Sequence, residues 1–144
     1  YGISKKNGEI NDNHNLTIRT STIGHEIETK HGLLEWFLDQ KQEIRGFSNA
    51  HFNGFTTNYL ARLIDDVVLK SRMTGLYNFS GDKISKYHLL KIINKVYNKN
   101  IKIIEDKKIK IDRSLDNKKL TKFSNLSLPK WKIMIEEMFL KRNI

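Results

Sequence analysis

One stretch of this chain, residues 16–23, limits the fold more than any other. β-Branched residues occupy most of its positions, which favours a strand, and Gly24 ends it. Residues 1 to about 10 precede it as a predicted helix, and the short polar residues 11–13 favour a turn between the two. A helix, a turn and a strand in this order are typical of an α/β sheet, in which ligands bind where the strands end. Residues 19–24 therefore fall where chemistry is expected.

The first nine residues read Tyr-Gly-Ile-Ser-Lys-Lys-Asn-Gly-Glu, with a tyrosine one helical turn before a lysine. Tyr1 and Lys5 lie on one face of a helix because they are four residues apart. The positive charge favours the phenolate, so it lowers the pKa of the tyrosine toward neutrality. A tyrosine of this kind can exchange a proton with a sugar hydroxyl, which makes the pair a candidate catalytic site. An ordinary amphipathic helix start is the alternative.

The longer pattern Tyr-Gly-x-Ser-Lys-x-x-Gly-Glu resembles the catalytic helix of the extended short-chain dehydrogenases/reductases, which act on nucleotide sugars. Among them, the chain is most similar to the dTDP-4-dehydrorhamnose reductases. The resemblance implies that Tyr1 protonates the forming alkoxide and that Lys5 holds the nicotinamide ribose, so that both also bind the cofactor, NADPH or NADH. In this family a glycine-rich turn for the cofactor pyrophosphate comes far earlier in the chain, and no Gly-x-Gly-x-x-Gly follows a strand here. We therefore expect the C-terminal part of a longer enzyme, inactive when isolated.

Residues 19–24, Arg-Thr-Ser-Thr-Ile-Gly, resemble a strand end of the same family. The resemblance implies that Thr20 and Ser21 lie by the nicotinamide of the cofactor and that Thr22 lies by the substrate. Plain β-propensity accounts for the same residue types equally well. His25 comes directly after this strand end, and it is a further candidate for substrate binding.

Two later segments carry the remaining candidate residues. Asn53 belongs to Phe-Asn-Gly-Phe-Thr-Thr, which resembles a family loop that forms a wall of the sugar pocket. Residues 113–120 are similar to a stretch that reads Arg-Pro-x-x-Ser-x-Leu-Asp-x-x-Lys-Leu in the family, although here the proline is absent and the spacing after the arginine is shorter. Arg113 is thus predicted to bind the substrate diphosphate, since a guanidinium fits phosphate. A structural ion pair with Asp112 or Asp116 is the alternative.

The rest of the chain alternates predicted helices and short strands. Trp36 is predicted to lie in the core, and the caps of two helices are assigned to Ser85 and to Thr56 or its neighbour. Helices are expected over residues 33–38, 57–68 and 85–97 and from Pro129 onward, strands over 43–47, 75–81 and 101–104, and a loop over 48–55.

The expected fold class is α/β, as the C-terminal part of a Rossmann-type NAD(P)-binding fold plus a small α/β substrate-binding lobe. Residues 1–24 would be the end of the nucleotide-binding domain, comprising the catalytic helix and the following strand. Residues 25–144 would form mainly the substrate-binding lobe. The strand at residues 75–80 is a candidate to return to the Rossmann sheet.

The composition of this chain of 144 residues indicates which kinds of partner to expect. Its net charge of +10 comes from lysines spread along the whole sequence, which favours solvated faces over a nucleic-acid groove with interleaved aromatic residues. The absence of cysteine fits a cytoplasmic setting, and no apolar run reaches the roughly 20 residues that span a bilayer. The histidines form no i, i+4 pair, so no metal site is expected.

Together, these features predict NAD(P)H-dependent reduction of a 4-keto sugar in the complete enzyme, for surface polysaccharide biosynthesis. The expected partner is a nucleotide-sugar substrate, with a homodimer as one option for the complete enzyme. A nucleotide-sugar 4-epimerase and a 4,6-dehydratase are the rivals within the family. From another class, a non-catalytic module that binds nucleic acid through its basic surface would show affinity that falls steeply with salt.

Overall fold

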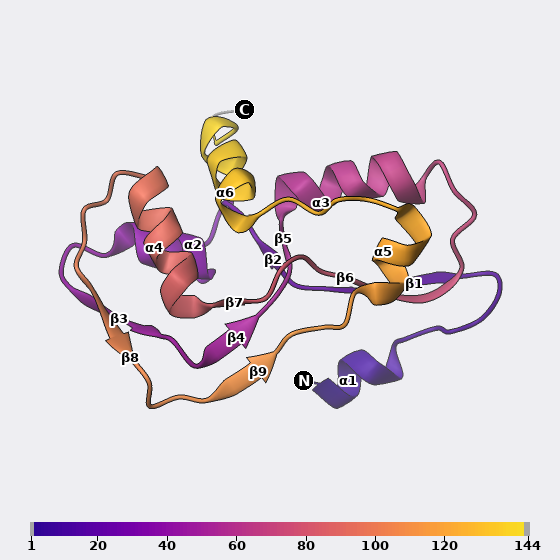
Figure 1. Cartoon of the computed structure of the whole chain (residues 1–144), viewed down its shortest axis with the longest axis horizontal. Helices are drawn as coiled ribbons and strands as arrows, with labels where there is room; N and C mark the ends of the chain where they lie inside the picture. The colour runs from indigo at the N-terminus through magenta and orange to yellow at the C-terminus, as the bar shows by residue number, and fades with distance from the viewer. Residues whose placement is uncertain (1, 143–144) are drawn as a thin grey trace.

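The structure is a computed structural model, and it describes residues 2–142. Helices and short strands alternate along the chain, which confirms the predicted α/β fold class (Figure 1). The helices are α1 (Gly2–Asn7), α2 (Leu33–Asp39), α3 (Thr57–Leu63), α4 (Lys86–Val96), α5 (Lys118–Ser124) and α6 (Trp131–Leu140), and a π-helical segment, η1 (Ile64–Val68), continues α3. The strands are β1 (Leu16–Thr20), β2 (Thr22–Ile23), β3 (Ile44–Phe47), β4 (Ala50–Phe52), β5 (Phe55–Thr56), β6 (Gly75–Phe79), β7 (Ile84–Ser85), β8 (Ile103–Asp106) and β9 (Ile111–Arg113).

Four small sheets organise these strands. β1 pairs with β6, β2 with β5 and β3 with β8, and each of these pairs is parallel. β4 lies between β7, which is antiparallel to it, and β9, which is parallel to it. Parallel strands need long crossover connections, and the helices supply them. The strand predicted after residue 75 is thus the partner of the strand that follows α1, while the division into two domains stays a prediction.

The single strand predicted over residues 16–23 is two strands in the structure. The chain pairs with β6 as far as Thr20, then changes partner at Ser21 and pairs with β5. The Ser21 carbonyl accepts a hydrogen bond from the Phe55 amide at 3.0 Å, and Gly54 packs so closely on that carbonyl that a Cβ there would collide with it. The prediction of one continuous strand was therefore wrong. The change of partner depends on Gly54, a glycine more than 30 positions away, which local residue preferences do not reveal.

The loop predicted over residues 48–55 contains β4, the central strand of the three-stranded sheet. Its neighbours come from two segments much later in the chain, since His51 pairs with Ser85 on one side and with Asp112 on the other. The strand predicted over residues 101–104 starts at Ile103 and runs to Asp106, because it follows the register of β3. Both corrections concern pairings between distant segments, which local residue preferences do not encode.

The core lies where the strands meet α2, α4 and α6, and leucine and isoleucine are its commonest residues. α4 and α2 lie on one side of the molecule and α3 and α5 on the other, with α6 between them (Figure 1). Trp36 is 40% exposed, so its predicted place in the core was wrong. The other tryptophan, Trp131, is buried and donates its indole N–H to the Asp82 carbonyl at 2.7 Å. On α2 the core positions belong to Leu34 and Phe37.

Several predicted helix boundaries are confirmed. The Thr56 hydroxyl accepts the Tyr59 amide at the start of α3, and the Ser85 hydroxyl accepts the His88 amide at the start of α4. Such caps satisfy amides that have no partner within the helix. The last helix begins at Trp131, slightly after the predicted start at Pro129.

Candidate functional site

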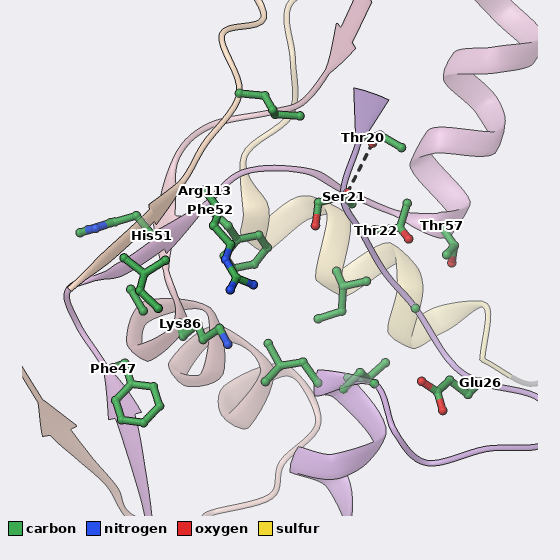
Figure 2. Close-up of a pocket in the computed structure, with 18 of the residues that line it drawn as sticks. Thr20, Ser21, Thr22, Glu26, Phe47, His51, Phe52, Thr57, Lys86 and Arg113 are labelled. Atoms are coloured by element: carbon green, nitrogen blue, oxygen red, sulfur yellow. Dashed lines mark hydrogen bonds between the residues drawn. The ribbon is translucent and has the colours of Figure 1, made fainter. Parts of the chain in front are cut away.

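A cavity of about 690 Å³ lies beside the end of β1. Its walls come mainly from residues 20–26, from residues 32–34 at the start of α2, and from β4 and β9 of the three-stranded sheet. Lys86 at the start of α4 also lines it. Figure 2 shows the hydroxyls of Ser21 and Thr22 on one side of this cavity and the side chain of Arg113 on the other. The predicted strand-end site and the predicted phosphate-binding residue therefore share one cavity.

Three consecutive hydroxyl residues, Thr20, Ser21 and Thr22, line the cavity where β1 gives way to β2. All three are exposed, so their hydroxyls are accessible to a ligand. The main chain beneath them is held by the Phe55 amide and by the close packing of Gly54 on Ser21. A rigid backbone with accessible hydroxyls at the carboxyl end of a parallel strand suits ligand binding.

Arg113 ends β9 and lines the same cavity. Its neighbour Asp112 pairs instead with Lys83 at 2.5 Å and accepts the Ser114 hydroxyl, and these bonds hold the pKa of Asp112 well below its ordinary value. Asp116 pairs with Lys118 at 3.4 Å. Within residues 2–142 Arg113 itself forms no ion pair, so the structural pair weighed as an alternative is absent from this part of the chain.

Asn53 is buried and does not belong to the cavity lining. Its side-chain amide donates to the Leu115 carbonyl at 2.8 Å, and its carbonyl oxygen accepts the Leu115 amide at 2.7 Å. The same amide also donates to the Gly81 carbonyl at 3.3 Å. Both amide hydrogens and one lone pair of the amide oxygen are thus used within the protein. These bonds position the segment after Arg113, and the substrate contact of Asn53 stays a prediction.

His25 lines the cavity, but both of its ring nitrogens contact protein groups. Nδ1 lies 2.7 Å from a Glu35 carboxylate oxygen, and Nε2 lies 2.8 Å from the Tyr97 hydroxyl. Burial raises the pKa of Tyr97 to about 12, so the phenol keeps its proton near neutral pH. In neutral His25, therefore, Nδ1 donates to the carboxylate and Nε2 accepts from the phenol. Both ring nitrogens of His25 are thus engaged within the protein, and its contact with a substrate stays a prediction.

The predicted catalytic pair lies apart from this description. Tyr1 is outside the described residues, and Lys5 is exposed on α1 and is not among the residues that line the cavity. One link between the segment after α1 and β1 is a two-fold contact from Arg19 to Glu9, with both N–O distances at 2.6 Å. The Arg19 hydrogen bond lowers the pKa of Glu9 below its ordinary value. This pair joins the segment after α1 to the strand that ends at Thr20.

Two further charged residues line the cavity, Glu26 and Lys86, and sequence reasoning missed Lys86. The Glu26 carboxylate accepts from the Thr29 hydroxyl at 2.5 Å and from the His31 amide at 2.9 Å, so it shapes its own loop. Lys86 is exposed at the first position of α4. A lysine in the first turn of a helix opposes the helix dipole, and that signal could have marked it in the sequence.

Within residues 2–142 the structure contains neither a metal-binding cluster nor a membrane-spanning helix. No group of three or more histidine, aspartate or glutamate side chains is arranged to hold a metal ion. None of the described helices has the length and apolar character needed to cross a membrane.

No protein-family model matches this sequence, and no curated protein does. Solved structures do match by fold. A dTDP-4-dehydrorhamnose reductase from Bacillus anthracis in complex with NADP is 16% identical, with a TM-score of 0.75 over 90% of this chain and 49% of its own. A UDP-N-acetylglucosamine 4-epimerase from Bacillus cereus is 17% identical, with a TM-score of 0.66 over 90% and 48%. A dTDP-glucose 4,6-dehydratase from Bacillus anthracis in complex with NAD is 15% identical, with a TM-score of 0.62 over 87% and 43%.

The chain thus spans about half the length of the solved structures that it matches. Its fold is that of the matching part of these nucleotide-sugar enzymes, as the motifs of the sequence predicted. At this level of identity the likeness concerns the fold alone.

Proposed function

We propose that this chain supplies the substrate-binding side of an NAD(P)H-dependent reductase that converts a 4-keto nucleotide sugar to the alcohol. The observation that carries the proposal is the meeting of strand-end hydroxyls and a guanidinium without an ion-pair partner, within residues 2–142, in one cavity. The fold likeness to nucleotide-sugar enzymes supports the same reading.

In this proposal different residues of the cavity bind different parts of the substrate. Arg113 binds the diphosphate, because its planar fork of N–H donors can grip phosphate oxygens in pairs. Thr22 lies by the sugar, and its hydroxyl can donate to or accept from a sugar hydroxyl. Ile23 and Leu34, which are buried and line the cavity, help to keep water from the reacting carbonyl.

The cofactor side of the proposal rests on Thr20, Ser21 and Lys5. The accessible hydroxyls of Thr20 and Ser21 stand on a main chain held by Gly54, which fits the nicotinamide end of a bound dinucleotide. NADPH or NADH would supply the hydride. Tyr1 would give the proton to the forming alkoxide, and Lys5 would favour the tyrosinate that remains after the transfer. We place this reaction in the cytoplasm, in the synthesis of surface polysaccharide.

A coupled assay of the protein that carries this chain tests the proposal. We expect oxidation of NADPH or NADH on addition of dTDP-4-dehydrorhamnose, with one reduced sugar formed per cofactor oxidised. Tyr1→Phe should lower turnover by roughly 10²–10⁴-fold, the usual worth of general acid catalysis. No cofactor oxidation with any 4-keto nucleotide sugar would reject the reductase.

The second candidate is a 4-epimerase or 4,6-dehydratase, which the fold likeness to both kinds of enzyme supports. These reactions return the hydride to the sugar, so they consume no cofactor. Conversion of a nucleotide sugar without net change in NAD(P)H absorbance would favour them over the reductase.

A further inference from the structure

Lys86 is the feature of the cavity that the proposed function has not used. It occupies the first position of α4 and lines the cavity, and its side chain is exposed. Its ammonium forms no hydrogen bond or ion pair with residues 2–142, and no acidic residue follows it in the first turn of α4. Figure 2 shows its ammonium extending toward the same part of the cavity as the guanidinium of Arg113, away from Glu26.

The sheet explains how these two cations come to face one cavity. Lys86 follows directly after β7, and Arg113 ends β9, the two edge strands on either side of β4. Phe52 pairs with Arg113 in one direction, while His51 pairs with Ser85 in the other. The two edges are about 10 Å apart, because neighbouring strands lie about 4.8 Å from each other. Two long side chains can therefore reach inward over β4 from opposite edges.

The position of Lys86 carries an electrostatic cost. The first turn of a helix has a partial positive charge, so a lysine there destabilises the helix unless an anion lies nearby. Neither Arg113 nor Lys86 is neutralised within the described chain, and Glu26 is bound by its own loop through Thr29 and His31. A residue that destabilises its own helix, with no compensating contact in the protein, is expected at a functional position.

We propose that Lys86 is the second phosphate-binding residue of the site, and that it contacts one phosphate of a nucleoside diphosphate while Arg113 contacts the other. This inference rests on the proposed function, since it names how the site holds the diphosphate of its nucleotide-sugar substrate. Two cations from opposite edges of a sheet suit a ligand with two adjacent anionic groups better than a single phosphate. Bound diphosphate also supplies the anion that the start of α4 lacks.

Calorimetric titration of the protein that carries this chain, with dTDP and UDP and with thymidine and uridine, tests this role. Lys86→Met keeps an apolar stem and removes the charge, and we expect it to weaken binding of the preferred diphosphate about tenfold, as for a lost charged hydrogen bond. Binding of the nucleosides should not change. Lys86→Arg should restore diphosphate binding to within about threefold, because it restores the cation. Lys91→Met is the matched control, since Lys91 is exposed on the same helix outside the cavity lining.

The melting temperature without ligand separates this role from a structural one. Lys86→Met removes a cation from the start of α4, so the variant should melt at the same temperature as the parent or higher. A lower melting temperature, or equal weakening of diphosphate and nucleoside binding, would overturn the proposal. So would unchanged diphosphate affinity in a variant that still turns over nucleotide sugar, and in that case the proposed function would stand. A parent protein that binds neither dTDP nor UDP would reject both.

Discussion

Asn53 holds the main chain of Leu115 at both of its polar groups, with the amide of Leu115 at 2.7 Å and its carbonyl at 2.8 Å. The two residues are 62 positions apart. This contact ties the end of β4 to the segment that leaves β9, just after Arg113. It therefore helps to fix the path of the main chain next to Arg113, and so the position of Arg113 at the cavity.

Asn53→Ala should lower the free energy of unfolding by about 1–3 kcal/mol, since it removes the partner of the part-buried Leu115 amide and one donor to the Leu115 carbonyl. Urea unfolding measures this effect. Asn49→Ala is the control, because Asn49 makes a single exposed bond to the Lys107 carbonyl. If Asn53→Ala reduced substrate affinity with no loss of stability, Asn53 would be a substrate ligand after all.

Arg113→Ala should weaken nucleotide-sugar binding by roughly tenfold or more, as expected for loss of a charged hydrogen bond. The melting temperature should stay near that of the parent, because Arg113 forms no ion pair within residues 2–142. Calorimetry and thermal melting of the same samples check both statements. Arg45→Ala is the control, since Arg45 pairs with Asp106 at 3.4 Å outside the lining of this cavity. A lower melting temperature with unchanged affinity would indicate a structural role for Arg113.

Gly54→Ala should destabilise the fold by about 1–3 kcal/mol, because the added methyl group would push against the Ser21 carbonyl and shift a packed main chain. Gly2→Ala, at the exposed start of α1 with nothing within 4 Å of the new methyl group, should change the stability by less than about 0.5 kcal/mol. Unfolding curves of both variants give the comparison. Equal effects of the two substitutions would contradict the close approach of Gly54 to Ser21.

Glu9→Gln should make the stability of the protein less sensitive to acid. The folded-state pKa of Glu9 is lowered by its hydrogen bond with Arg19, so its contribution is full above the ordinary glutamate pKa of about 4.3. The contribution is lost as pH falls from there through the lowered folded pKa. Urea unfolding at pH 6 and pH 3 should therefore show a smaller drop in Glu9→Gln than in the parent. Parallel drops in both proteins would show that the pair does not contribute.

Tyr97→Phe should lower the free energy of unfolding by about 0.5–1.5 kcal/mol, because it removes the hydrogen bond to Nε2 of His25. Glu35→Gln should cost less, since a glutamine oxygen can still accept from Nδ1 of neutral His25. NMR of the His25 ring would then show the Nδ1-protonated tautomer in the parent protein. Detection of the Nε2-protonated tautomer would overturn the assigned direction of both hydrogen bonds.

Local sequence signals predicted most of the helices, although α5 (Lys118–Ser124) was missed. Thr56 and Ser85 cap their helices as expected, because capping depends on a side chain and an amide only three residues away. The family motifs predicted that the strand-end hydroxyls and Arg113 bind cofactor or substrate, and all of these residues line one cavity. Their roles toward cofactor and substrate remain predictions for the experiments above.

The sequence by itself determined the α/β class and the caps at Thr56 and Ser85, since these follow from neighbours within a turn or a strand. Its family motifs supplied the candidate binding residues. Only the tertiary structure decided that β4 is a central strand, that Trp36 faces solvent, and that His25 is held by Glu35 and Tyr97. It also brought Lys86 and Arg113 to one cavity from opposite edges of a sheet. The physical reason is that strand partners and buried polar bonds join residues tens of positions apart, where the choice depends on the packing of the whole chain and not on local preference.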